Sequence, residues 1–324
     1  MYRLLALMAA LCAIGGLLGC KANSDKVVLK LGHTLDAGHP VHRAMLVMNE
    51  RLVEISGGTM RIDLYPSGQL GSEREMMELL QIGSLAMTKV STSPMENFVP
   101  EMKIFSLPYV FRDQDHFWRM LESDLGQNLL VAGEKVRLRG LVYYDAGSRS
   151  FYTTNKAIHA PDDLKSLKIR VQKSQTSVAM IDALGGSATP ISWGELYTAL
   201  QQGVVDGAEN NPPSFYRSKH YEVSKYYTLD EHTYVPDMLI ISAHIWHNLT
   251  QQQQQWLQQA ADESVAVQRR LWAQDTAEAL REVEAAGVQI IYPDKTLFAD
   301  KVQHMHTELK GSSLEVLLNK IHSL

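Results

Sequence analysis

Two arginines in largely apolar surroundings are the side chains of this sequence best suited to bind a small anion. Arg170 lies inside the strand-like run 168–172, and Arg149 lies in the aromatic-rich segment 143–152. A guanidinium group can hold a carboxylate through two parallel hydrogen bonds, because its N–H fork matches the two oxygens. Each arginine could equally form a surface salt bridge, worth about 0–1 kcal/mol. The residues alone leave both interpretations open.

A second group of polar side chains lies in the stretch Asp-Gly-Ala-Glu-Asn-Asn-Pro-Pro at 206–213. It follows the apolar-rich run 200–205, which we interpret as a strand, so it is either a surface turn or a ligand site at a strand's end. Carboxylates accept hydrogen bonds from hydroxyl groups, and amides both donate and accept. Glu209, Asn210 and Asn211 are therefore candidate ligand contacts. The two prolines are expected to turn the chain out of the site.

Glu73 and Trp193 complete this first set of candidates, each at the expected start of a helix. An arginine clamp with nearby acceptors and amides suits a polyhydroxylated acid, and an aromatic face can cover a sugar ring. Each candidate alone could also be an ordinary cap, turn or core residue. Glu73 and Glu209 could alternatively form the acid/base pair of a glycosidase, but nothing in the sequence sets their separation.

The sequence lacks the common enzyme signatures: it has no phosphate-binding glycine loop, no Gly-x-Ser-x-Gly and no His-Glu-x-x-His. The tightest set of metal-ligand residue types comprises His33, Asp36, His39 and His42, whose spacing fits no strong ligand template. These residues fall where a helix is expected to begin. We therefore predict no metal site and no cofactor.

Strands and helices alternate along the chain, which is the pattern of an α/β fold. The clearest predicted strands are 27–31, 60–65, 168–172 and 288–292, and the clearest predicted helices are 40–55, 72–83, 174–184 and 251–286. The last of these is long enough to span two domains, and a length of 324 residues favours more than one.

One pattern occurs twice in the sequence. Ser72-x-x-Glu75 leads to Leu-Gln-Ile-Gly at 80–83, and Ser192-x-x-Glu195 leads to Leu-Gln-Gln-Gly at 200–203. Each copy reads as a helix of equal length that begins with a capping box and leads into an apolar strand. The repetition predicts two α/β lobes of similar build.

The N-terminus has the features of a secretory signal. An arginine at position 3 precedes the apolar run 4–18, and Leu-Leu-Gly-Cys at 17–20 resembles a bacterial lipobox. We expect residues 1–19 to be a lipoprotein signal peptide and Cys20 to carry lipid; simple cleavage or a short buried helix are the alternatives. The other of the 2 cysteines is Cys12, so the mature chain has no disulfide. The formal net charge of −5 argues against a nucleic-acid partner, because proteins that bind nucleic acids are usually basic.

Five short motifs resemble those of the solute-binding proteins of tripartite ATP-independent periplasmic (TRAP) transporters, and the resemblance extends in order from about residue 26 to the end of the sequence. They are Leu70-Gly-x-Glu-Arg74, Leu107-Pro-Tyr109, Leu167-Lys-Ile-Arg170, Glu195-x-Tyr197-x-x-Leu200 and Val205-Asp-Gly-x-Glu-Asn210. The resemblance implies a two-lobed periplasmic binding protein with a long helix spanning both lobes. It implies capture of an organic acid and delivery to a small and a large membrane subunit of a sodium-coupled permease, without enzymatic turnover.

The resemblance also assigns roles to residues. It makes Arg170 the principal carboxylate anchor and Arg149 a second donor, with Asn210 and Glu73 as further contacts. Ser91 stands where the sialic-acid binders of the family have a glutamate, which argues against sialate. The segments 191–195 and 208–213 are more similar to those of members that bind uronic or aldonic acids.

We expect the first lobe to comprise 26–146 with about 236–275, and the second to comprise 147–235 with about 276–324. The alternatives for function are a binder of C4-dicarboxylates or other carboxylates, an extracytoplasmic enzyme acting on sugar acids, and an accessory protein of a sensor.

Overall fold

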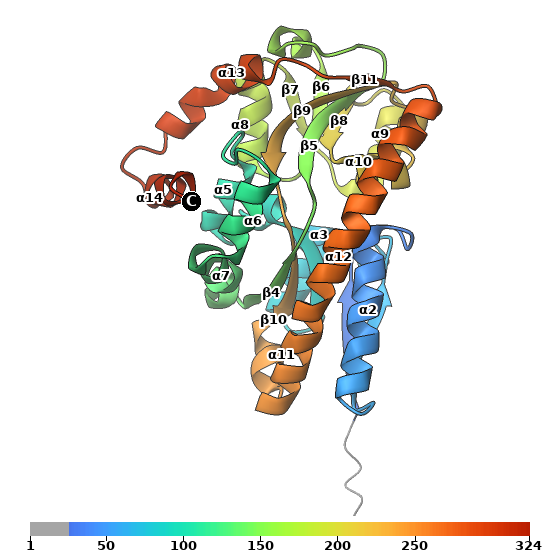
Figure 1. Cartoon of the computed structure of the whole chain (residues 1–324), viewed down its shortest axis with the longest axis vertical. Helices are drawn as coiled ribbons and strands as arrows, with labels where there is room; N and C mark the ends of the chain where they lie inside the picture. Colours follow the sequence, from blue (N-terminus) through green and yellow to red (C-terminus); the bar gives the residue numbers. More distant parts are fainter. Residues whose placement is uncertain (1–25) are drawn as a thin grey trace, which may run out of the picture.

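The computed structural model describes residues 26–324, so the predicted signal peptide and Cys20 lie outside the described residues. The chain forms two separate sheets (Figure 1). The first has the order β2-β1-β3-β10-β4, with β1 Val27–Gly32, β2 Met60–Tyr65, β3 Met87–Ser91, β4 Leu138–Tyr144 and β10 Asp237–Ser242. The second has the order β11-β9-β5-β8-β6-β7, with β5 Ser148–Thr153, β6 Lys168–Val171, β7 Ser187–Pro190, β8 Gly207–Asn210, β9 Tyr226–Tyr234 and β11 Gln289–Ile291.

Helices pack against both faces of each sheet. They are α2 Pro40–Ile55, α3 Glu73–Gln81, α4 Thr92–Met95, α5 Lys103–Ser106, α6 Gln114–Glu122, α7 Asp124–Val131, α8 Gln175–Leu184, α9 Trp193–Gln201, α10 Pro212–Arg217, α11 Ala243–Asn248, α12 Gln251–Ala285, α13 Lys295–Thr307 and α14 Ser313–His322. Short 3-10 helices lie at Pro100–Met102, Ala132–Val136, Pro161–Leu164 and His220–Glu222. The mixed α/β, two-lobed architecture predicted from the sequence is confirmed.

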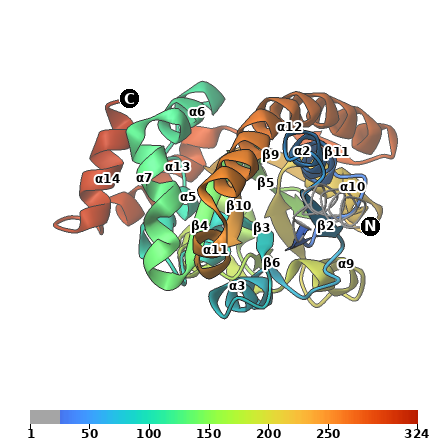
Figure 2. The ribbon, with the colours of Figure 1, turned by 90° about the horizontal axis from the view of Figure 1, so that it is seen from below.

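The apolar core has three parts. One lies between the first sheet and helices α2, α11 and α12, and another lies between the second sheet and helices α9 and α10 with the end of α12. The third contains side chains from both sheets, such as Val90 and Ile169, together with α5–α8, α13 and α14. Figure 2 shows α6, α7 and α14 gathered on the side of the molecule away from α2 and α10. The two sheets are therefore joined along one side by a shared core.

The long helix α12 links the two parts of the molecule. It has 35 residues, about 52 Å at 1.5 Å per residue, and it contacts α2 and β4 at one end and α10 at the other. Thr250 and Gln253 form a complete capping box at its start. Midway along it, the buried Gln268 side chain accepts a hydrogen bond from Asp145 N and donates one to Asp145 O, both of 2.8 Å.

The chain passes between the sheets twice as an extended segment, from β4 to β5 through 145–147 and from β9 to β10 through 235–236. The first sheet contains strands from 27–144 and 237–242 and the second contains strands from 148–234 and 289–291; the boundaries of the two lobes stay a prediction. In the C-terminal range, α13 contacts α8, whereas α14 crosses back to contact α5. The segment 276–324, which we assign to the second lobe, therefore contacts helices of both lobes.

Two local expectations were wrong. The run 200–205 was predicted both as a strand and, at 200–203, as the end of a helix. The helix is correct, because Leu196 and Leu200 pack into the core at helical spacing and α9 continues to Gln201. The strand is β8, inside the polar stretch itself. The second capping box is also absent, since Ser192 makes no side-chain cap bond. The first box, between Ser72 and Glu75, is present, and both helices have 9 residues.

Candidate ligand-binding site

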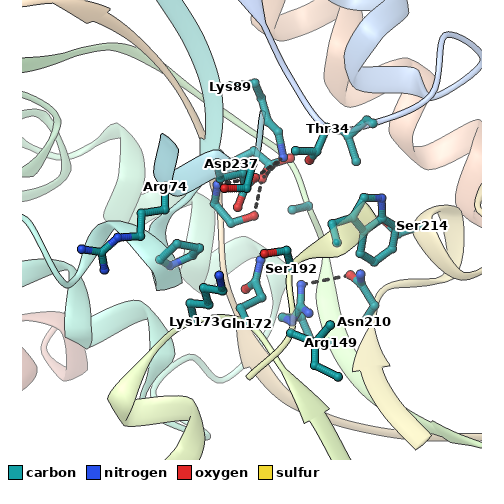
Figure 3. Close-up of a pocket in the computed structure, with 18 of the residues that line it drawn as sticks. Thr34, Arg74, Lys89, Arg149, Gln172, Lys173, Ser192, Asn210, Ser214 and Asp237 are labelled. Carbon is teal, nitrogen blue, oxygen red and sulfur yellow. Dashed lines mark hydrogen bonds and ion pairs between the residues drawn. The ribbon is translucent and has the colours of Figure 1, made fainter. Parts of the chain in front are cut away.

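A pocket lies between the two sheets, and side chains from both walls line it (Figure 3). The first-sheet side supplies Thr34, Leu35, Ser72, Glu73, Arg74, Lys89, Ser91, Pro94 and Asp237; the second-sheet side supplies Arg149, Arg170, Gln172, Lys173, Ile191, Ser192, Trp193, Asn210, Asn211 and Ser214, with Ala146 from the crossing segment. Seven of the eight predicted ligand contacts thus line one pocket. Glu209 is the exception.

Arg170 is a buried cation that has no carboxylate partner among the residues that the structure describes. Its side chain comes from β6 and is only 2% exposed; Nε donates to the Ile191 carbonyl at 2.9 Å. Within residues 26–324 the buried Nη1 atom has no hydrogen-bond partner. The guanidinium carbon lies 5.8 Å from the centre of the Trp193 ring, and burial lowers the pKa of Arg170 below its ordinary value. A ligand carboxylate would supply the missing partner.

Arg149, from β5, is instead fully engaged by the protein. Its Nη1 donates to Asn210 Oδ1 at 2.9 Å, and its Nη2 donates to the carbonyl and to Oε1 of Glu209 at 2.7 and 2.9 Å. Nε also pairs with Glu209 Oε2. Neighbouring residues of a strand point to opposite faces of the sheet, so Asn210 reaches the pocket while Glu209 lies behind Arg149. Glu209 therefore positions an arginine and does not line the pocket, contrary to its prediction as a direct ligand contact.

His232 completes the polar group behind this wall. Its Nδ1 lies 2.8 Å from Asp230 Oδ2 and its Nε2 lies 3.6 Å from Glu209 Oε2. Burial alone would lower the pKa of His232, but Asp230 and Glu209 raise it to about 9. Burial would likewise raise the pKa of Glu209, but Arg149 and His232 lower it to about 2.

The charges of the buried group in and behind this second-sheet wall do not cancel, and Lys173 adds a further positive charge to the same wall. Arg149, Arg170 and His232 are positive and the carboxylates of Glu209 and Asp230 are negative, so the five groups sum to 3 − 2 = +1. The uncompensated charge is that of Arg170. Burying an unpaired charge is costly, so this wall is built to receive one negative charge from outside.

The opposite wall is a cluster of Lys89, Glu73, Asp237 and Ser91, hereafter the Lys89 cluster. Lys89 Nζ lies 3.1 Å from Glu73 Oε1 and 3.0 Å from Asp237 Oδ1, and Ser91 Oγ donates to Asp237 Oδ1 at 2.8 Å. Strand pairing places Asp237 directly opposite Ser91, and Lys89 two residues along β3 points to the same side. Burial alone would lower the pKa of Lys89, but Asp237 and Glu73 raise it above its ordinary value.

Two amides lie beside the arginines. Asn210 Oδ1 accepts from Arg149 and from the Asn211 backbone, and Asn211 caps α10 by accepting from Ser214 N at 2.9 Å. Because the oxygens are used within the protein, the NH₂ groups are the parts of these amides suited to a ligand. The two prolines occupy the first turn of α10. We expected the prolines to turn the chain out of the site, but they begin a helix. The first N–H groups of a helix have no partner within it, so the N–H that proline lacks is not missed there.

The histidine cluster noted in the sequence makes internal contacts. His33 Nε2 lies 2.9 Å from His42 Nδ1, and His39 caps α2 by accepting from Val41 N at 3.2 Å. Burial lowers the pKa of His33 to about 3. Across residues 26–324, no three histidine, cysteine or acidic side chains are grouped so as to hold a metal ion.

Sequence reasoning missed Lys89, Asp237 and His232. A lysine inside the otherwise buried run of β3 was a signal that could have been used, because charged side chains are rarely buried without partners. Asp237 and His232 gave no such signal, because their roles depend on strands that pair across the fold.

The fold and the pocket define a two-lobed binding protein that takes up a small, hydroxylated anion between its lobes. The chain belongs to the bacterial extracellular solute-binding proteins of family 7, whose model matches residues 31–311.

Solved relatives share the fold over nearly their whole length. A TRAP periplasmic solute-binding protein of Bradyrhizobium sp. BTAi1, in complex with α/β-D-galacturonate, is 39% identical with a TM-score of 0.89, over 91% of this chain and 99% of that one. One of Pseudomonas putida F1 with bound D-glucuronate is 35% identical with a TM-score of 0.89, over 92% and 97%. The sialic acid-binding periplasmic protein SiaP of Vibrio cholerae is 30% identical over 91% and 92%.

Proposed function

We propose that the protein captures a sugar acid with a single carboxylate, a hexuronate or a related aldonate, and delivers it to a TRAP permease. The observation that carries this proposal is Arg170, a buried guanidinium that lacks a carboxylate partner within the described chain. Arg149, held in place by Glu209, adds a second positive group beside it. The uronates bound by the two solved relatives support the same ligand class.

In this proposal each wall recognises a different part of the ligand. The carboxylate takes the free Nη1 of Arg170, with Asn210 and Asn211 as neighbouring donors. Glu73, Asp237 and Ser91 accept from hydroxyl groups, and the Trp193 ring covers an apolar face of the sugar. Because the two walls belong to different sheets, binding favours their approach, which excludes water and strengthens the charge pair. No covalent step is required.

The charge balance separates this ligand class from C4-dicarboxylates. A dicarboxylate needs a second cation opposite Arg170. On that side of the pocket Lys89 is already shared between two carboxylates and Arg74 pairs with Glu78, whereas Lys173 lies on the same side as Arg170. Ser91 places a short hydroxyl where the resemblance assigns a glutamate to sialate binders, so sialate is a poorer candidate as well.

Delivery involves two membrane subunits of a sodium-coupled permease, which the family membership supports. We propose a periplasmic location with a lipid anchor at Cys20. The described helices include none that is long and apolar enough to cross a membrane.

A binding screen tests the proposal. Wild-type protein, refolded from denaturant to remove co-purified ligand, would be screened by thermal shift against uronates, aldonates, sialate and C4-dicarboxylates, since a bound ligand raises the melting temperature by mass action. We expect uronates or aldonates to give the largest shifts, and Arg170→Ala to lose about 2–5 kcal/mol of binding by calorimetry. The largest shift with a dicarboxylate, or unchanged affinity in the variant, would refute the proposal. Ligand recovered unaltered after incubation would separate a binder from an enzyme.

A further inference from the structure

We propose that the Lys89 cluster excludes a second carboxylate from the pocket, so that the protein binds sugar monoacids and rejects the corresponding diacids, the aldarates. This inference rests on the proposed function and adds a specificity-determining role for Lys89 and Asp237. Uronates, aldonates and aldarates of one sugar share the stereochemistry of the carbons between their ends. Uronates and aldonates carry one charge, at opposite ends of the chain, and aldarates carry two. Aldonates and aldarates are open chains, whereas uronates are mainly pyranose rings, so the aldonate is the closer match to the aldarate in shape.

The cluster carries a net negative charge despite its lysine. Lys89 contributes +1 and the carboxylates of Glu73 and Asp237 contribute −2, so the sum is 1 − 2 = −1. Lys89 and Asp237 are 2% and 4% exposed, so water screens these charges only weakly. The lysine bonds to both carboxylates of the cluster, which leaves it a poor partner for a third.

The two walls of the pocket thus have opposite polarity. The buried group around Arg170 sums to +1, and Lys173 adds a further positive charge on the same side. The Lys89 cluster sums to −1, and its neighbour Arg74 is paired with Glu78. Figure 3 shows Lys89 and Asp237 across the pocket from Arg149 and Asn210. A ligand with one charged and one neutral end matches both walls. A diacid anchored at Arg170 would point its other carboxylate at Glu73 and Asp237.

Hydroxyl groups, in contrast, suit the cluster well. The carboxylate oxygens of Glu73 and Asp237 accept hydrogen bonds, and the hydroxyl of Ser91, which donates to Asp237, keeps its lone pairs for a ligand donor. The third N–H of Lys89 can donate to a hydroxyl oxygen. The same groups therefore bind the hydroxylated end of a monoacid and repel the second carboxylate of a diacid. Specificity then comes partly from repulsion of the competing ligand.

The test compares matched ligands on wild-type protein. D-Galacturonate, D-galactonate and galactarate form one set, and D-glucuronate, D-gluconate and glucarate form a second; each is titrated by calorimetry at one pH and ionic strength. We expect the diacid of the bound set to bind at least about 100-fold more weakly than the better monoacid, as for juxtaposed like charges.

Charge variants then locate the source of the discrimination. Asp237→Asn brings the cluster from −1 to 0, and we expect it to reduce the monoacid-to-diacid affinity ratio about tenfold or more; Glu73→Gln is the second variant, in case the first does not fold. The matched control is Asp63→Asn on β2, where Asp63 pairs with Arg61 at the surface. The control should leave the ratio unchanged.

The outcomes separate this inference from the proposed function. If a monoacid and its diacid bind equally to the wild type, the inference is overturned while the proposed function stands. An unchanged ratio in both folded cluster variants would overturn it too. If no sugar monoacid binds at all, the proposed function fails and the inference fails with it.

Discussion

The two buried arginines of the pocket should respond to the same substitution in opposite ways. Replacing Arg170 with methionine removes a cation that has no carboxylate partner in the described chain, whereas replacing Arg149 leaves the carboxylate of Glu209 buried without its main partner. Both variants should lose ligand binding. Only the second should lose stability.

The magnitudes follow from the contacts. Arg170 keeps one hydrogen bond to the protein, from Nε to the Ile191 carbonyl, and a bond from a charged group contributes about 1.5–3 kcal/mol. The desolvation penalty of a buried ion is several kcal/mol, so Arg170→Met should raise the free energy of unfolding by about 1–3 kcal/mol. Breaking the Arg149–Glu209 pair should lower it by about 3–5 kcal/mol.

The assay is scanning calorimetry on ligand-free wild type, Arg170→Met and Arg149→Met, each refolded from denaturant. A change of 1 kcal/mol moves the melting temperature of a chain of this size by about 2–4 °C. We expect Arg170→Met to melt a few degrees above the wild type and Arg149→Met clearly below it. If both variants melt below the wild type by a similar margin, Arg170 is a structural residue and the argument from its unpaired charge is wrong.

Two further predictions concern pH and anchoring. His232 has a folded pKa of about 9, above its ordinary 6.5, so its contribution to stability is complete below pH 6.5 and is lost as the pH rises towards 9. His33 and His220, whose pKa values are lowered to about 3, take up protons mainly on unfolding, so their contribution is lost as the pH falls from 6.5 towards 3. Denaturant titrations from pH 4 to 9.5 should thus show stability declining on both sides of about pH 6.5, and His232→Gln should flatten the alkaline side; an equal alkaline decline in that variant would contradict the assignment. Cys20→Ser should move the protein from the membrane fraction to the soluble periplasmic fraction, and identical fractionation of both proteins would argue against a lipid anchor.

Local sequence signals predicted the elements well where their ends carry specific residues. Helix α2 was predicted to its exact limits because Pro40 suits its first turn and two glycines follow it. The capping box of α3 was likewise correct. The second box failed because Ser192 meets the pocket and does not cap α9. Spacing alone does not show which way a serine hydroxyl turns.

The site was predictable only in its outline. The arginines and Asn210 could be named because their residue types suit a carboxylate, and Glu209 was misplaced because the alternation of a strand puts it on the face opposite Asn210. Lys89 and Asp237 meet only because β10 pairs with β3 across 148 residues of sequence. No local pattern encodes that pairing.

The hydrogen bonds of Gln268 have a mechanical consequence. A primary amide presents a donor and an acceptor side by side, as the N–H and C=O of one residue in an antiparallel strand do. The Gln268 side chain therefore pairs with Asp145 as a neighbouring strand would, at the point where the chain leaves the first sheet. Two bonds of opposite sense resist sliding of the crossing segment along α12 in either direction. They resist turning much less, and Gly147, two residues on with φ of 56°, has the backbone freedom to absorb it. The long helix therefore anchors this crossing segment at Asp145, beside a glycine that can change the direction of the chain.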